Sequence, residues 1–199
     1  MSNNMDKIQS YPIVDSIPTE PFESLVEMYY QLEGYITSSN KWFWVRESGK
    51  KQRGYQDIDV LAINDDETLI ISVTINLDDK VRFGRNGKLR EDMLEDLSRY
   101  FDRVETYLKN VGKYNWLIKN KRKVKRIIAY AYGGYKKEEK RKELEDELGK
   151  RGIELISSKE IIEYLKKKIE KIQDKGLKTN NQLVKMIQLW LKMERKTSV

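Results

Sequence analysis

The chain has 199 residues, of which 36% are charged and 39% hydrophobic, and it contains no cysteine and no histidine. These absences exclude disulfide bonds, thiol nucleophiles, zinc fingers, iron–sulfur clusters, Ser-His-Asp triads and histidine-ligated metals. Any chemistry must therefore come from carboxylates, lysine, tyrosine, serine or threonine, or from a hard metal ion held by oxygen atoms.

Charge is unevenly distributed along the chain. The net charge is +7, yet residues 1–75 carry 12 acidic and 6 basic side chains, whereas residues 76–199 carry 20 acidic and 33 basic ones. An acidic first part and a basic remainder indicate an acidic site beside a surface that binds a polyanion. A solvated, lysine-rich surface with no partner is the alternative.

Nothing in the sequence predicts a membrane protein. No apolar run approaches the ~18 residues of a membrane span, and residues 1–10 lack the apolar centre of a signal peptide. We therefore expect a cytoplasmic protein without a membrane partner.

Hydrophobic periodicity predicts elements in the order α-β-β-β-α-β-α-β-α-α. Three strands after one helix, followed by strand–helix alternation, are typical of an α/β fold with a mixed central sheet flanked by helices. The chain divides into a flexible arm (1–18), a core domain (19–172) and a C-terminal helical extension (173–199). The expected elements are a helix over 20–33, strands over 41–46, 55–63 and 69–75, a helix over 89–110, a strand over 124–132, a helix over 136–150, a strand over 153–157, and helices over 158–173 and 180–196.

Local signals support several of these elements. The apolar face of the first helix includes Phe22 and Val26 and extends to Ile36, and Gly34 ends the helix. A capping pattern at Ser158 begins a later helix. The run Leu69–Ile75 is β-branched and nearly continuous, which predicts a central buried strand.

Two aspartates, Asp57 and Asp59, lie two residues apart where a strand becomes apolar. Alternation along a strand puts them on the same sheet face. Because burying unpaired carboxylates beside an apolar core is costly, we expect a metal ion, a cationic partner or a water-filled cleft there. An exposed strand end with two solvated aspartates is the alternative. Glu23 and Glu27, one turn apart on the first helix, are further carboxylates for such a site, or part of a solvated helix surface.

Together these segments resemble the PD-(D/E)XK nuclease superfamily, and within it Mrr-type restriction enzymes and archaeal Holliday-junction resolvases. The resemblance rests on Phe22–Val26, on Gly34-Tyr35 eleven positions after Glu23, and on the strand Gly54–Ala62. It covers about residues 20–135 and implies a restriction-endonuclease-like fold that hydrolyses DNA phosphodiesters with Mg²⁺ or Mn²⁺.

The resemblance also implies roles for individual carboxylates. Glu23 falls on the helix glutamate of the family, and Asp59 falls on its metal-binding aspartate. Asp57 would be an auxiliary carboxylate. All three are thus candidate catalytic residues and metal ligands, in an endonuclease of DNA repair, recombination, restriction or a mobile element.

The sequence departs from this family at the E-x-K motif of the next strand. Ser72-Val73-Thr74 replaces the acidic metal ligand and the lysine that orients or activates the attacking water. Three interpretations stay open. In the first, Asp57 supplies the missing ligand and Lys80, Arg90 or Arg99 replaces the lysine. In the others, the site is inactive and the fold binds DNA without cutting it, or the fold is a scaffold for protein–protein contacts.

Two basic segments are candidates for contacts with DNA phosphates, and a solvated loop and turn are the alternatives. Phosphate binding would make affinity fall steeply with salt. The candidate nucleic-acid-binding residues are Lys80, Arg82, Arg85, Lys88 and Arg90 after the strand 69–75, and Lys121, Arg122 and Lys123 before the strand 124–132.

Aromatic and apolar residues predict further contacts. Trp42, Phe43 and Trp44 alternate along a strand, so at least one faces outward, for packing, a dimer interface or base stacking. The last helix either closes the domain or pairs with a second subunit, so a homodimer is one expected assembly. Its predicted apolar stripe is Leu183, Ile187, Trp190 and Leu191.

Overall fold

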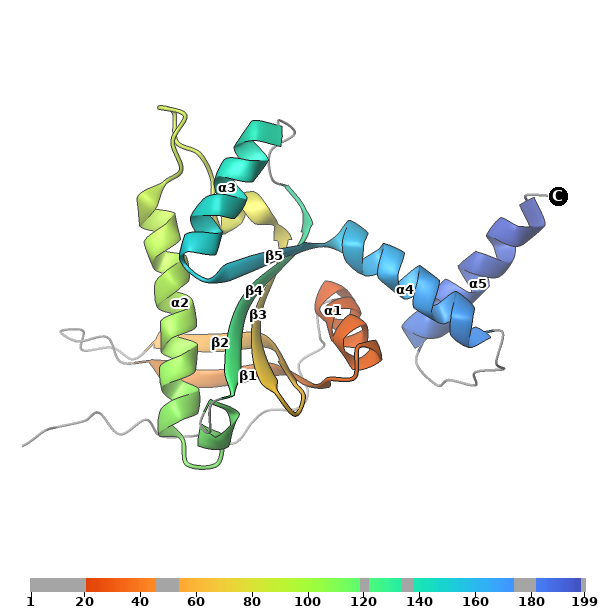
Figure 1. The fold of residues 1–199 in the computed structure, drawn as a ribbon, viewed down its shortest axis with the longest axis horizontal. Helices are drawn as coiled ribbons and strands as arrows, with labels where there is room; N and C mark the ends of the chain where they lie inside the picture. The colour runs from red at the N-terminus through yellow and green to blue at the C-terminus, as the bar shows by residue number, and fades with distance from the viewer. Residues whose placement is uncertain (1–20, 46–53, 119–121, 134–137, 174–181, 198–199) are drawn as a thin grey trace, which may run out of the picture.

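The computed structural model describes residues 21–45, 54–118, 122–133, 138–173 and 182–197 (Figure 1). The arm expected over residues 1–18 lies outside them. Helices and strands follow in the predicted order, which confirms an α/β fold with a mixed sheet. They are α1 (Pro21–Leu32), β1 (Ile36–Val45), β2 (Gly54–Ile63), β3 (Glu67–Asn76), α2 (Glu91–Asn110), β4 (Lys123–Tyr132), α3 (Glu138–Lys150), β5 (Ile153–Ser157), α4 (Ser158–Gln173) and α5 (Gln182–Thr197), with short 3-10 turns η1 (Leu77–Asp79) and η2 (Asn115–Leu117).

The five strands of the described residues form one mixed sheet in the order β1-β2-β3-β4-β5. β1, β2 and β3 are antiparallel neighbours, and β3, β4 and β5 run parallel. The crossovers through α2 and α3 lie on the same face because parallel crossovers keep one hand. No helix in the described part of the chain is long and apolar enough to cross a membrane.

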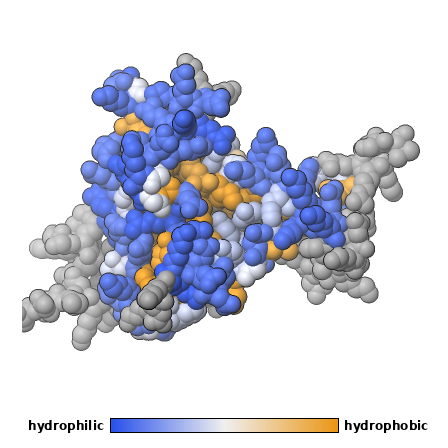
Figure 2. Space-filling view, viewed as in Figure 1, coloured by the Kyte–Doolittle hydropathy of each residue, from blue (hydrophilic) through white to orange (hydrophobic). Residues whose placement is uncertain are grey.

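The sheet separates two apolar cores. On one face, Phe101 of α2 and Leu144 of α3 pack against the sheet, and on the other face Val26 of α1 and Ile161 of α4 do so (Figure 1). Leu69–Ile71 of β3 is buried between the two layers, as its nearly continuous apolar run predicts. Figure 2 shows hydrophilic side chains over most of the visible surface, with apolar surface gathered near β5.

β1 begins at Ile36, five residues before the predicted start at Lys41. The first half of the strand is polar, and such a sequence carries no local strand signal. It is a strand because its backbone pairs with the apolar end of β2, from Ile36 opposite Ile63 onward. The assignment of Ile36 to the apolar face of the first helix was therefore wrong, and its side chain is 77% exposed.

Two helix ends refine the sequence prediction. Gly34 follows α1 with a φ of 91°, a conformation that glycine adopts without strain. α4 begins at Ser158 as predicted, but Ser157 is its cap. The Glu160 N–H donates to the Ser157 hydroxyl at 3.3 Å, and the Ser157 N–H donates to the Glu160 carboxylate at 2.7 Å. This reciprocal pair is a capping box.

α5 packs on α4 through only part of the predicted stripe. Leu191 is buried and Ile187 packs against the same core. Trp190 is 40% exposed, and the Lys166 ammonium lies 3.5 Å from its ring centroid. The side chain of Leu183 lies outside the described part of the chain. A second row of exposed apolar residues on α5 consists of Met186, Leu189 and Met193.

Candidate active site

β2 and β3 pair along only part of their length, and we call the place where their pairing ends the fork. Only residues 60–63 of β2 pair with residues 68–71 of β3. The first half of β2 remains paired with β1 alone, down to Gly54, while the second half of β3 remains paired with β4. Figure 1 shows β1 and β2 turning away from β3 and β4. The fork begins at Asp59.

The backbone is irregular at this point. Asn40, which lies between Ser39 opposite Val60 and Lys41 opposite Ile58, has a φ of 52°. Asparagine is one of the few residues that tolerate this left-handed conformation. Ile58 and Leu61 pack in the same core, on the α2 side, although strict alternation would place them on opposite faces. The alternation assumed for Asp57 and Asp59 is therefore interrupted between them and the apolar half of the strand.

The Asp59 carboxylate spans the fork. Its Oδ2 accepts the Val73 N–H at 2.6 Å and the Ser72 hydroxyl at 3.2 Å. The carboxylate thus satisfies a backbone donor of β3 that the backbone of β2 no longer reaches. Asp59 is 9% exposed and Ser72 is fully buried. An acidic residue at position 72 would repel Asp59, whereas serine donates a hydrogen bond to it.

The charged form of Asp59 is only partly stabilised by the protein. Burial raises the pKa of the Asp59 carboxyl above its ordinary value, and the negative charge of Asp57 acts in the same direction. The Val73 N–H, the Lys80 ammonium and the Ser72 hydroxyl oppose this rise without cancelling it. A cation bound at the fork would favour the ionised carboxylate further.

Lys80 is the basic residue that the fold brings to Asp59. It follows η1, the short turn at the end of β3, and its positive charge acts on the Asp59 carboxylate. Its ammonium lies 5.9 Å from the ring centroid of Tyr100. The other two candidates for the relocated lysine form ion pairs at the surface, Arg90 with Asp92 and Arg99 with Asp96.

Tyr100 of α2 completes the site, and the sequence analysis did not single it out. Its hydroxyl is buried and has no hydrogen-bond partner among the described residues. Burial and the negative charges of Asp59 and Asp57 raise the pKa of Tyr100 well above its ordinary value, while the Asp59 backbone and the Ser72 hydroxyl oppose this rise. A buried hydroxyl without an acceptor beside two carboxylates indicates a place for a water or a ligand atom. Its position next to Phe101, at the edge of the apolar stripe of α2, is the only local signal for it.

Glu23 does not join Asp57 and Asp59 in one carboxylate cluster. α1 packs on the sheet face opposite α2, and Oε2 of Glu23 is shielded from solvent there. In the described part of the chain, no three acidic residues form a group that could hold a metal ion. Thr74, at the motif position of the lysine, donates its hydroxyl to the carbonyl of Asn76 at 3.0 Å.

The basic loop between η1 and α2 is a short hairpin. Phe83 and Leu89 form a β-bridge, and the Gly84 N–H donates to the Lys88 carbonyl at 2.8 Å. Lys140 of α3 anchors the tip by donating to a loop carbonyl at 2.6 Å. Exposed side chains from this hairpin are Arg82, Arg85 and Lys88, whereas Arg90 is paired with Asp92.

In the second basic segment, Arg122 and Lys123 have different environments. Arg122 donates to the carbonyl oxygens of Asn64 and Glu67, so it clamps the β2–β3 turn rather than facing outward. Lys123 is exposed at the start of β4, and Lys121 lies outside the described residues.

The aromatic run of β1 has one outward residue among its described side chains. Trp42 lies opposite Asp57 and is 44% exposed, as the alternation predicts. Phe43 is buried and stacks on Tyr107 of α2 with ring centroids 4.4 Å apart. An exposed tryptophan thus borders the fork.

Comparisons with known proteins identify no family. No protein-family model matches the chain, and no curated protein matches it. Two solved structures are similar: a protein of unknown function, AF1548, at 16% identity with a TM-score of 0.37, and protein VC1899 from Vibrio cholerae, at 12% identity with a TM-score of 0.38. Each match covers 71% of this chain, and 64% and 30% of the respective relative. This chain therefore corresponds to less than two thirds of either protein.

Proposed function

We propose that this chain acts on DNA as a PD-(D/E)XK-type nuclease and hydrolyses phosphodiester bonds at the fork between β2 and β3. The observation that carries the proposal is the buried Asp59 at the opening of the sheet, with Lys80 and Asp57 within electrostatic reach. A carboxylate, a lysine and an unsatisfied buried tyrosine hydroxyl converge there from three elements, as expected of a site built for a ligand.

The residues at the fork fit a hard divalent cation. Mg²⁺ prefers oxygen ligands and keeps several waters, so one or two carboxylates together with substrate phosphate oxygens are enough. Asp59 and Asp57 would hold the ion, and its charge would offset the burial that raises the pKa of Asp59. When bound, the ion would neutralise charge on the reacting phosphate. Mn²⁺ binds the same oxygen ligands.

Lys80 and Tyr100 supply the remaining groups. In the reaction, a water oxygen bonds to phosphorus, the bond to the leaving sugar oxygen breaks, and a proton from the water ends on that leaving oxygen. The Lys80 ammonium would stabilise the negative charge that builds on the phosphate oxygens. The Tyr100 hydroxyl would donate a hydrogen bond to the attacking water or to a phosphate oxygen. Lys80 would thus replace the motif lysine from a position six residues after Thr74.

The hairpin between η1 and α2 would hold the DNA backbone. It begins at Lys80, so its exposed Arg82, Arg85 and Lys88 are carried on a segment that starts at the fork. Contacts to phosphates position a duplex without reading its sequence. The exposed Trp42 at the border of the fork could stack on an unpaired base.

A DNA-binding protein without nuclease activity is the second candidate. It is favoured by the state of Asp59, whose Oδ2 already accepts two hydrogen bonds from the protein. It is also favoured by Ser72, which stands where the family has an acidic ligand. In this alternative, the same fork is a relic of a metal site and only the basic hairpin contacts DNA.

Cleavage assays separate the two candidates. Labelled duplex, single-stranded and four-way-junction DNA would be incubated with Mg²⁺ or Mn²⁺ and the purified chain, with an Asp59→Asn variant and with an Asp65→Asn control. Asp65 is an exposed acid in the β2–β3 turn, so the control removes the same charge away from the fork. We expect cutting by the wild type and the control, and a loss of at least about a hundredfold in Asp59→Asn, because even outer-shell changes at metal sites cost 10–100-fold.

Two other outcomes have definite meanings. Salt-dependent binding with no cutting in any protein would favour the non-catalytic candidate. Cutting that survives in Asp59→Asn at the wild-type rate would contradict the proposed site.

A further inference from the structure

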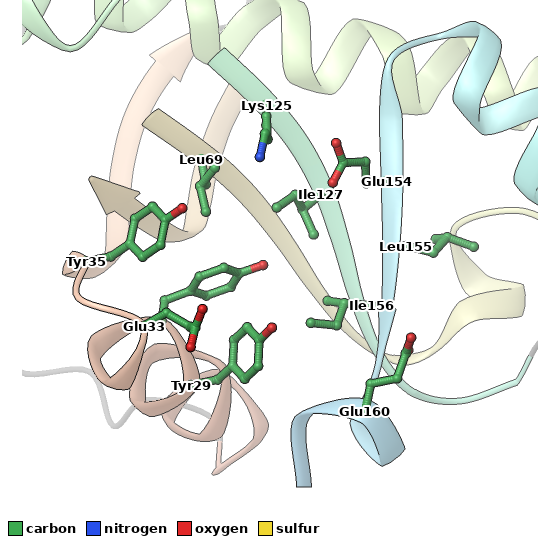
Figure 3. Close-up of a pocket in the computed structure, with 11 residues that line it drawn as sticks. Tyr29, Glu33, Tyr35, Leu69, Lys125, Ile127, Glu154, Leu155, Ile156 and Glu160 are labelled. Carbon is green, nitrogen blue, oxygen red and sulfur yellow. The ribbon is translucent and has the colours of Figure 1, made fainter. Parts of the chain in front are cut away.

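A pocket lies on the sheet face that α1 and α4 cover, opposite the face covered by α2. It has a volume of about 290 Å³, is open to solvent on one side and is bordered by α1, β3, β4, β5 and the start of α4 (Figure 3). Leu69 and Ile127 line its sheet side, while Tyr29, Tyr30 and Tyr35 contribute aromatic walls. None of these tyrosines is part of the proposed nuclease site.

The tyrosine walls are locked at steep angles. Tyr30 meets Tyr29 at 88° with ring centroids 4.8 Å apart, and it meets Tyr35 at 83° with centroids 5.6 Å apart. Tyr164 of α4 packs edge-on against Tyr29 at 4.8 Å. Rings in these T-shaped contacts stabilise one another. The pocket therefore has rigid aromatic walls in nearly perpendicular planes.

Tyr30 of α1 is a nearly buried tyrosine that lines this pocket. It is 6% exposed. Burial, followed by the negative charges around it, including those of Glu154 and Glu67, raises the pKa of Tyr30. A tyrosine hydroxyl that lines a pocket can donate a hydrogen bond to a ligand or to water there.

The charges around the pocket are mainly negative. Glu33, Glu154 and Glu160 line it together with a single ammonium group, that of Lys125 (Figure 3). Lys125 is committed to an ion pair with Glu67 at 3.0 Å. Glu33 is held by Tyr164 and lies 3.6 Å from Lys168, and Glu160 caps α4. Glu154 makes no ion pair within the described part of the chain.

We propose that this pocket binds an organic cation, an ammonium or guanidinium group carried on a short alkyl chain. Aromatic faces attract cations through their quadrupole, most strongly where water is excluded. Glu154 would supply the counter-charge at the rim, and the Tyr30 hydroxyl would hydrogen-bond a polar atom of the ligand or a water bound with it. The carboxylates would repel a phosphate, so this site and the DNA-contacting hairpin select opposite charges. The inference does not depend on the nuclease proposal.

Calorimetric titration of the full chain tests this inference. The probes are choline, its neutral isostere 3,3-dimethylbutan-1-ol, and agmatine, which carries a guanidinium group and an ammonium group. We expect saturable binding of at least one cation, and binding of the neutral isostere at least about tenfold weaker than choline if choline is the cation bound. Absence of saturable binding by both cations, or equal binding of choline and its neutral isostere, would overturn the proposal.

Matched variants locate the site. Glu154→Gln should weaken cation binding about tenfold, whereas Glu163→Gln, which removes an exposed charge on α4 outside the pocket, should leave it unchanged. Tyr30→Phe keeps the ring and should weaken binding about threefold to tenfold. Far-UV circular dichroism verifies that each variant is folded. Equal effects of Glu154→Gln and Glu163→Gln would refute binding at this pocket.

A peptide titration distinguishes the source of the cation. A blocked pentapeptide with a central arginine or trimethyllysine would be compared with the corresponding free probe. Tighter binding of the peptide would assign the site to a side chain of a partner protein. Equal or weaker binding would assign it to a free small molecule.

Discussion

Two carboxylates, one at each end of the β2–β3 pair, have pKa values shifted in opposite directions. Glu67, at the turn, accepts the Tyr35 hydroxyl at 2.5 Å and forms an ion pair with Lys125 at 3.0 Å. Burial acts to raise its pKa, but these two partners outweigh burial and lower it. Asp59, at the fork, also has hydrogen-bond donors, yet burial prevails and its pKa is raised.

The difference supports the proposal that one strand pair carries a structural carboxylate, Glu67, and a ligand-binding one, Asp59. Glu67 is neutralised by a cation in direct contact, so it stabilises the turn where Arg122 also clamps the backbone. Asp59 has no cation in direct contact among the described residues, and its incompletely offset charge costs stability. A buried carboxylate that costs stability in this way is typical of a group that binds a ligand.

The largest effect is expected at Lys80. Replacing Lys80 with Met should lower the rate of DNA cleavage by about a hundredfold or more, because positioned acid–base and charge-stabilising groups contribute 10²–10⁴-fold. Lys88→Met, which removes an exposed charge from the same hairpin, should change the rate much less. Single-turnover cleavage at saturating protein measures both. Equal losses in the two variants would reduce Lys80 to a general phosphate contact.

Asp59→Asn should stabilise the folded protein at neutral pH. Because the pKa of Asp59 is raised in the folded state, the protonated form is favoured there. Protonated Asp59 contributes its full stabilisation below the pKa of about 3.9 that an aspartate has in the unfolded chain. This stabilisation is lost as the pH rises through the pKa of Asp59 in the folded protein. Asparagine removes that loss, so the free energy of unfolding should rise by about 1–3 kcal/mol at pH 7 and by little near pH 4.

Urea unfolding of both proteins across this pH range checks the sign. A variant that is less stable than the wild type at pH 7 would contradict the contrast with Glu67. Addition of Mg²⁺ should raise the thermal midpoint of the wild type and leave Asp59→Asn unchanged, since the ion binds only the folded state through this carboxylate.

Glu67→Gln should destabilise the protein by about 1–2 kcal/mol at neutral pH, because it weakens a charge-assisted hydrogen bond and an ion pair. The lowered pKa of Glu67 means that its contribution is present above the unfolded pKa of about 4.3 and disappears as pH falls through the folded value. Chemical unfolding of Glu67→Gln and Tyr35→Phe at pH 7 and pH 3 measures this. An equal loss of stability at pH 7 and pH 3 would show that the interactions of Glu67 with its partners are not electrostatic.

The smallest effect concerns DNA affinity. Arg85→Ala should weaken duplex binding only a few-fold and reduce the slope of log affinity against log salt by about 0.9, the contribution of one phosphate contact. Arg122→Ala should leave that slope unchanged, because Arg122 is engaged with the carbonyls of the β2–β3 turn. Fluorescence anisotropy at several salt concentrations compares them. A larger slope change in Arg122→Ala would mean that the turn, and not the hairpin, faces DNA.

The order of the elements was predictable because its signals are local. Helical and strand periodicities, Gly34 after the first helix and the apolar run at Leu69–Ile71 all lie within a few residues of the structure they specify. The polar start of β1 was missed because its strand conformation depends on pairing with β2. The cap of α4 was placed one residue late because consecutive serines, Ser157 and Ser158, both allow a capping pattern.

The candidate site was predictable only in part. Asp57 and Asp59 stand out in the sequence because two carboxylates lie where a strand becomes apolar. Lys80 was one of three basic candidates, and only the fold selects it. Tyr100 carried no distinctive signal, since a tyrosine beside an apolar helical stripe is usually a packing residue.

The amino-acid composition already limits the available chemistry, because a chain without cysteine or histidine leaves carboxylates, lysine and hydroxyl groups. The succession of helices and strands also follows from the sequence, since it depends on the spacing of apolar residues along short segments. The point where β2 separates from β3, and the residues that meet at the fork, depend instead on contacts between distant segments. Asp59 and Tyr100 are 41 residues apart in the chain, and they lie together because α2 crosses the face of the sheet at the point where strand pairing ends.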